Sequence, residues 1–131
     1  MKTKTIIAIA GVFGVVSVGL GALGAHGLKP ILTPNQMDSF LTGTKYNMYH
    51  ALLLFSLIPL RPYIKEKWFK IAARCIILGT ILFSGSIYLL ATKDVTGIEL
   101  MSLLGPITPI GGLTLIIGWS SIIKGALKQK T

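Results

Sequence analysis

A run of twenty uncharged, mostly apolar residues at 6–25 restricts the fold of this 131-residue sequence more than any other feature. An α-helix rises about 1.5 Å per residue, so such a run is long enough to cross the ~30 Å hydrocarbon layer of a bilayer. Hydrophobic residues make up 52% of the chain, charged residues only 13%, and the mean hydropathy is +0.73. Too few polar residues remain to cover a water-soluble core, and the apolar content excludes a disordered chain. The sequence therefore predicts an integral membrane protein surrounded by the lipid bilayer.

Further apolar segments follow the first, and together they predict an all-α fold, a four-helix transmembrane bundle in a single integral membrane domain, residues 1–131. The expected spans are 6–25, 44–60, 71–91 and 106–123. The first run is longer than the ~7–15 apolar residues of a signal peptide, so we expect it to be retained. Pro106 and Pro109 predict a kink at the outer end of the fourth span.

Two short patterns predict additional helix starts. Thr33-Pro34-Asn35-Gln36 has the form of a capping box, which predicts a helix beginning at Pro34. The first turns of that helix are amphipathic, so residues 34–42 are expected to form an interfacial helix, with Gly43 as a hinge to the second span. Thr96 and Glu99 repeat the capping pattern and predict a helical stretch through Leu104.

The charge distribution predicts the orientation of the bundle. The net charge is +9, from 13 Lys and Arg against four Asp and Glu. With four spans, the side that carries both termini and the second connector holds all of these cations except Lys29, Lys45 and Lys93. The positive-inside rule then places both termini in the cytoplasm, and we expect a multi-pass protein of the bacterial inner membrane. Because membrane topology accounts for the cations, nucleic acid is not expected as a partner.

Small residues recur every three or four positions along the first and fourth spans, which places them on one face of each helix. They are Ala10, Gly14, Ser17, Gly21 and Gly24 in the first, and Gly111, Thr114, Gly118, Ser121 and Gly125 in the fourth. In lipid such faces allow close helix packing, within the chain, against a second copy or against another membrane protein. We predict that Gly14 and Gly21 lie at helix–helix contacts and that Gly11 does not.

Common catalytic patterns do not occur in the sequence. It has one cysteine and no zinc-binding pair, phosphate-binding loop or nucleophile elbow. The middle of each expected span lacks Asp, Glu, Lys and Arg, which argues against an ion-coupled transporter. We therefore expect no enzymatic activity, no cofactor and no metal site.

Two histidines remain as candidates for a polar site. His26 follows the first span, and His50 lies about one turn into the second, on the same helix face as Asn47. Three interpretations stay open: a hydrogen-bonded cluster that pins helix ends, a pocket for a lipid head group, quinone or small solute, and ligation of a metal or haem. The last is the weakest, because two histidines without further ligands make a poor site.

Four sequence blocks resemble a known family. They are GALGAHGL at 21–28, YNMYHA at 46–51, LFSGSIY at 82–88 and ITPIGG at 107–112, the last leading to Gly118-Trp119. In this order they resemble the small membrane proteins of domain-of-unknown-function family 423, also called uncharacterised protein family 0382. The resemblance implies a four-span membrane protein, bacterial at this length, with relatives in animal mitochondria and no established activity.

On the expected topology these blocks meet in the outer half of the bundle, which suggests a shared polar site or a packing contact that such a bundle needs. The candidate binding residues are His26, Asn47, Tyr49, His50, Ser84, Tyr88 and Thr108. Our first interpretation is a non-enzymatic structural or partner-binding bundle. The alternative is a protein that binds or transports a lipid or small molecule at this site, and the third is a redox protein that holds quinone or haem.

Overall fold

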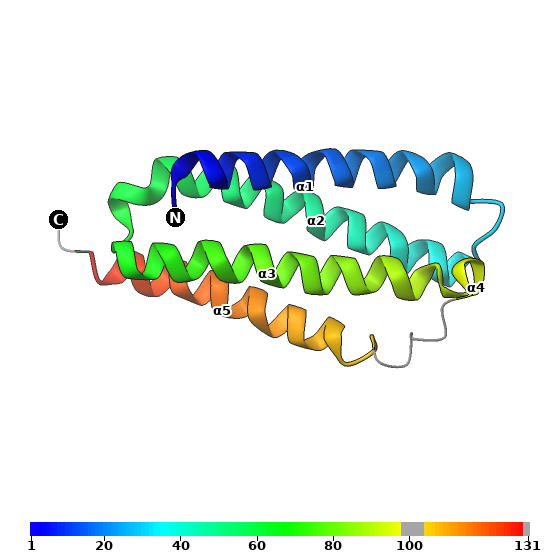
Figure 1. The fold of residues 1–131 in the computed structure, drawn as a ribbon. Coiled ribbons are helices and arrows are strands. Elements are labelled where there is room, and N and C mark those ends of the chain that lie inside the picture. Colours follow the sequence, from blue (N-terminus) through cyan, green and yellow to red (C-terminus); the bar gives the residue numbers. More distant parts are fainter. Residues whose placement is uncertain (98–103, 130–131) are drawn as a thin grey trace.

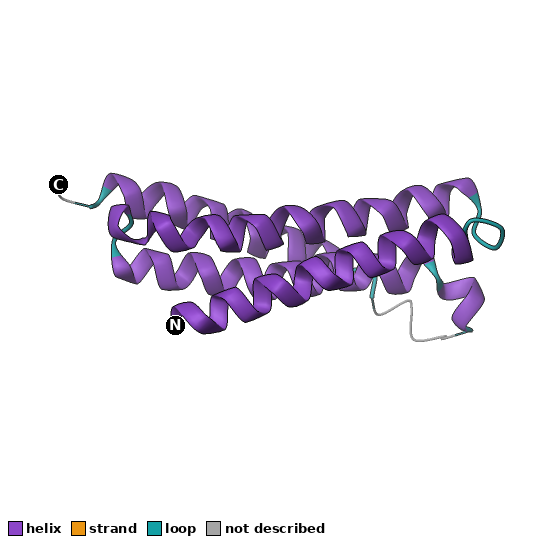
Figure 2. Ribbon diagram, turned by 90° about the horizontal axis from the view of Figure 1, so that it is seen from above, coloured by secondary structure: helices purple, strands orange, loops and turns teal. Residues whose placement is uncertain are grey.

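The chain folds into long helices that pack side by side, as the computed structural model of residues 1–97 and 104–129 shows (Figures 1 and 2). In chain order the elements are α1 (Thr3–Leu23), the π-helical turn η1 (Gly24–Leu28), α2 (Pro34–Leu60), the 3₁₀ turn η2 (Arg61–Tyr63), α3 (Glu66–Ala91), the single turn α4 (Lys93–Thr96) and α5 (Ile107–Leu127). Helices α1, α2, α3 and α5 run alternately in opposite directions (Figure 1). The all-α prediction is confirmed for the part of the chain that the structure describes.

Three of the described helices are long and apolar enough to cross a membrane. They are α1 with η1, α3 and α5. Helix α2 has 27 residues, which is sufficient length, but it carries more polar side chains than the other three. Its place in the bundle therefore depends on how it packs and not on hydropathy alone.

The start of α2 follows the predicted capping box. The backbone N–H of Thr33 donates to Oε1 of Gln36 at 2.9 Å, and that of Gln36 donates to Oγ1 of Thr33 at 3.3 Å. The predicted break between residues 34–42 and 44–60 does not occur, because α2 is continuous, and the assignment of the two parts to the interface and to a span stays a prediction. Gly43 is not a hinge but a contact point: a Cβ there would lie 2.9 Å from Cε1 of Tyr88 and 3.0 Å from Cγ2 of Ile87.

Other helix boundaries also differ from the prediction. Helices α1 and α3 begin earlier than expected, at Thr3 and Glu66. Helix α5 begins directly after Pro106, and Pro109 lies in its first turn, where a backbone N–H has no partner within the helix. The predicted kink is therefore a helix start. The helix predicted from Thr96 falls on residues 98–103, outside the described part of the chain.

Glycines bring α5 against α3. A Cβ at Gly111 would overlap the backbone nitrogen of Phe83 and lie 2.8 Å from its Cα, and a Cβ at Gly118 would lie 2.9 Å from Cγ1 of Ile76. A Cβ at Gly125 would lie 2.8 Å from Cβ of Trp68 in α3 and 2.5 Å from Cγ2 of Ile64 in the connector before it. The small-residue face predicted in the fourth span is therefore a real packing surface.

In α1 the same prediction holds only in part. Ala10, Ser17 and Gly24 are buried, and a Cβ at Gly21 would contact Cγ2 of Thr44 at 3.5 Å. The prediction for Gly14 is wrong within this chain, because a Cβ there would meet nothing within 4 Å among the described residues. Gly14 lies only about 40° around the helix from Ala10 and is half-buried, but the neighbouring helices do not reach the position of its Cβ.

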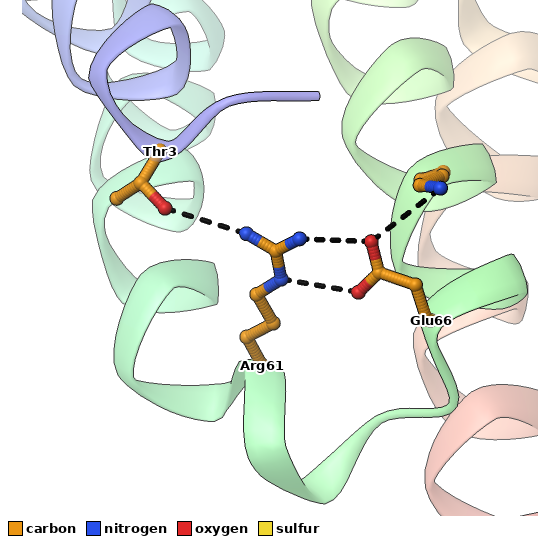
Figure 3. A network of polar contacts seen from close by, with 4 residues as sticks. Thr3, Arg61 and Glu66 are labelled. Carbon is orange, nitrogen blue, oxygen red and sulfur yellow. Dashed lines mark hydrogen bonds and ion pairs between the residues drawn. The ribbon is translucent and has the colours of Figure 1, made fainter.

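Polar contacts tie both chain ends to the α2–α3 connector. Arg61 donates through Nε and Nη2 to the two carboxylate oxygens of Glu66, at 3.0 and 2.8 Å, and through Nη1 to Oγ1 of Thr3 at 3.4 Å (Figure 3). The backbone N–H of Lys65 donates to the carbonyl of Gly125 at 3.2 Å. The two ends of the chain therefore lie at the same end of the bundle (Figure 1).

Candidate functional site

The seven predicted site residues do not gather into one cluster. His26 is exposed on η1, and Tyr49 is an exposed residue of α2 whose ring lies beside that of Tyr46, with 5.8 Å between centroids. The other five lie inside the bundle or at its helix contacts, in three places, and Tyr88 of the third place reaches the side chain of Asn47 in the first.

The first of these places is the contact between α1 and α2. Asn47 is only 3% exposed, and its Nδ2 donates to the carbonyl of Phe13 at 3.0 Å. One turn away, Oγ of Ser17 donates to the carbonyl of Thr44 at 2.7 Å. Side chains of each helix thus bond to the backbone of the other, which identifies Asn47 as a residue that joins two helices.

The second place surrounds His50, which is 4% exposed. Its Nδ1 lies 2.7 Å from the carbonyl oxygen of Tyr46, one turn earlier in α2. The hydrogen bonds of the structure do not join it to Asn47 or His26, so the predicted three-residue cluster does not form. Because α2 begins at Pro34, His50 lies about four turns into the helix and near the middle of the bundle, not at its outer end.

A cavity of about 290 Å³ adjoins His50 between α2, α3 and α5. Apart from His50, its walls are aromatic or aliphatic side chains and one glycine: Tyr46, Phe83, Gly112, Leu115, Ile116 and Trp119. The ring of Tyr46 lies 5.1 Å from that of Phe83 and 6.1 Å from that of His50, centroid to centroid. We call this cavity the His50 pocket.

The third place is the C-terminal part of α3. Ser86 and Thr108 share a hydrogen bond of 2.7 Å between their hydroxyls, which joins α3 to α5. Oγ of Ser84 is buried and has no hydrogen-bond partner in the described part of the chain, whereas the buried hydroxyl of Tyr88 lies beside the side chains of Thr44 and Asn47 of α2. The ring of Tyr88 packs against that of Phe40 at 5.3 Å.

A second cavity, of about 400 Å³, lies at this end of the bundle beside Thr108 and the start of α2. Its Gln36 and Asp94 already bond to each other, from Nε2 to Oδ2 at 2.6 Å. The His50 pocket is the stronger candidate site, because its imidazole uses only one ring nitrogen in a hydrogen bond to the described residues.

Sequence reasoning missed three of the walls of the His50 pocket: Tyr46, Phe83 and Trp119. All three stand in or beside the family-like blocks, and Tyr46 precedes His50 by one helical turn, so a signal was present. The blocks could not reveal which helices face each other. Within residues 1–97 and 104–129 no group of three His, Cys, Asp or Glu side chains is arranged to hold a metal ion.

Comparisons with known proteins give a consistent result. A family model described as "Protein of unknown function (DUF423)" matches residues 20–112. The chain is 40% identical to a UPF0382 membrane protein of Schizosaccharomyces pombe over 121 residues, 91% of this chain and 98% of that protein. It is 36% identical to the UPF0382 membrane protein YwdK of Bacillus subtilis, covering 95% and 98%, and 32% identical to the UPF0382 inner membrane protein YgdD of Escherichia coli K12, covering 99% and 95%. No solved structure matches.

Proposed function

This chain belongs to the DUF423 family of membrane proteins, and we propose that it is a four-span cell-membrane protein that binds a small amphiphilic molecule without catalysing its conversion. The proposal has two parts: that α2 is the fourth span, and that the His50 pocket is the binding site.

The direction of the helices supports α2 as a span. Helices α1 and α3 run the same way, so a chain that crosses with α1 has to cross back before α3 (Figure 1). Helix α2 makes that return, and its Asn47 and His50 are buried within the bundle. These two polar side chains lower the mean hydropathy of α2 without being exposed to lipid, whereas the exposed Asn35, Asp38 and Lys45 lie in its first half.

The charges support an orientation with both termini in the cytoplasm. The end of the bundle with the chain ends and η2 carries the basic residues of both termini and the connector, whereas Lys29 and Lys93 lie in the turns at the other end and Lys45 lies in the half of α2 that begins there. A reporter that is active only in the cytoplasm should work when fused to either terminus. Activity of a C-terminal fusion only outside the membrane would refute the four-span arrangement.

One observation carries the binding function: a buried imidazole in an otherwise apolar pocket near the middle of the bundle. Buried polar side chains are normally fully hydrogen-bonded, so one that faces a cavity is a typical feature of a binding site. Trp119 and Ile116 at the pocket wall are exposed on the outer surface of the bundle. A ligand would therefore enter sideways, from the lipid.

Native mass spectrometry of the protein released from its own membrane tests this function. We expect a retained mass on the unmodified chain and its loss in His50→Ala, with the helical content of the variant unchanged. Asn47→Ala is the matched control on the same helix, and it should keep the mass. If the unmodified chain retains nothing, or if His50→Ala retains as much as the unmodified chain, the binding function is wrong.

A second candidate function, association with a partner helix, is favoured by the outward face of α1. A Cβ at Gly11, Gly14 or Gly19 would meet nothing within 4 Å among the described residues. Small residues on a lipid-facing surface allow another helix to approach closely, and a second copy of the chain is the simplest partner. Gly19→Leu should then reduce oligomer size in mild detergent, whereas Gly85→Leu, at an open position on α3, should not.

A further inference from the structure

The hydrogen bond to Tyr46 determines which nitrogen of His50 carries a proton. Nδ1 lies 2.7 Å from the carbonyl oxygen of Tyr46, and a carbonyl oxygen can only accept. Nδ1 is therefore the donor. In the neutral imidazole the other nitrogen, Nε2, has a lone pair and can only accept.

The surroundings of His50 favour the neutral imidazole. None of the residues that line the pocket is acidic, and the ring is almost completely buried. An imidazolium without a carboxylate partner is costly to bury in apolar surroundings. Within the described part of the chain no side chain or backbone N–H donates to Nε2, so the pocket presents an unused acceptor.

The size and walls of the pocket limit what can reach that acceptor. A cavity of about 290 Å³ is roughly twice the ~150 Å³ that encloses a benzene molecule, so the part of a ligand that lies inside it is about one substituted ring. Tyr46 and Phe83 form an aromatic wall on which a further ring packs well. The exposed rim at Ile116 and Trp119 leaves room for an apolar tail to continue into the lipid.

We propose, as a refinement of the binding function above, that the ligand of the His50 pocket is an amphiphile with an aromatic hydroxyl head group. Its O–H donates a hydrogen bond to Nε2 of His50, its ring lies against Tyr46 and Phe83, and its apolar tail leaves between α2 and α5. A head group that offers only acceptors, such as an aromatic ether or a ring ketone, leaves Nε2 unpaired and binds more weakly.

The two tryptophans of the chain allow a direct test. Trp119 lines the pocket, whereas Trp68 packs against Gly125 at the other end of α5, with Nζ of Lys124 4.6 Å from its ring. In the full-length Trp68→Phe variant in lipid nanodiscs, Trp119 is the sole tryptophan and reports on the pocket. The probes are 4-hexylphenol and 4-hexylanisole, which differ only in replacement of the hydroxyl by a methyl ether. Trp119→Phe, which retains Trp68, is the control for partition into lipid.

We expect saturable quenching of Trp119 with an affinity about tenfold higher for the phenol than for the ether, the effect of one buried hydrogen bond. Adding His50→Phe keeps a ring but removes the acceptor, and the preference should disappear. If the Trp68→Phe variant with His50 intact binds both probes equally, or binds the ether more tightly, the inference about the head group is wrong. The pocket would still be a binding site. Quenching no more saturable than in Trp119→Phe would overturn the binding function as well.

Discussion

Replacement of Gly111 by alanine should destabilise the bundle, although alanine is the better helix former. The added Cβ would lie 2.8 Å from Cα of Phe83 and 2.9 Å from the backbone carbonyl carbon of Leu82. Carbon atoms in contact lie about 3.5–4.0 Å apart, so α5 has to move away from α3 by about 1 Å. No side-chain rotation relieves this overlap, because the obstructing atoms belong to the backbone of α3.

The expected loss follows from two opposing contributions. Overpacking of this kind costs about 1–3 kcal/mol, and a backbone obstacle places it near the upper limit. Replacing glycine by alanine inside a helix gains about 1 kcal/mol. The net loss in the free energy of unfolding should therefore be about 2 kcal/mol.

Gly112 provides the matched control one position along the chain. A Cβ there would lie 3.8 Å from the ring of Phe83, an ordinary contact, so Gly112→Ala should be neutral or stabilise by up to about 1 kcal/mol. Both variants can be unfolded from mild detergent with increasing sodium dodecyl sulfate, followed by far-ultraviolet circular dichroism. The reasoning fails if Gly111→Ala is as stable as the unmodified chain, or if both alanine variants lose the same stability.

Three further predictions concern stability in the same assay. Asn47→Ala should lower the free energy of unfolding by about 1 kcal/mol, because it removes the buried hydrogen bond between α1 and α2. Ser84→Ala should cause no such loss, because the serine hydroxyl has no partner in the described part of the chain. Gly21→Leu should destabilise the bundle through its contact with α2, whereas Gly14→Leu, which meets open space, should unfold like the unmodified chain. Thr33→Ala should cost about 1 kcal/mol by removing the N-cap of α2.

Each of these predictions has an outcome that contradicts it. A loss at Ser84 as large as that at Asn47 would mean that the serine hydroxyl is hydrogen-bonded after all. Equal loss at Gly14 and Gly21 would mean that both glycines pack inside the bundle, as the residue spacing alone suggested. If the stability of Thr33→Ala is unchanged, the side-chain hydrogen bond of Thr33 at the start of α2 does not contribute to the stability of the bundle.

The features that could be predicted from the sequence depend on neighbouring residues or on bulk composition. The long apolar runs predicted helices long enough to span a bilayer, and three of the described helices meet that expectation. The capping box at Thr33 predicted the start of α2 correctly because its two hydrogen bonds form within a single helical turn. The placement of most Lys and Arg residues on one side followed from the order of the apolar segments, because alternate connectors lie on opposite sides.

Only the tertiary structure decided which faces of these helices meet. In a soluble protein the polar face of a helix marks its outer side, but in lipid both faces are apolar, so periodicity carries little information about packing. The Cβ position of Gly14 therefore meets open space although its spacing matches that of buried neighbours, and Gly43 lies within a continuous helix, where its missing side chain leaves room for Tyr88 of α3. The His50 pocket has the same origin. Tyr46, Phe83 and Trp119 come from three helices, and the close packing of α5 against α3 at Gly111 and Gly118 brings two of those helices together.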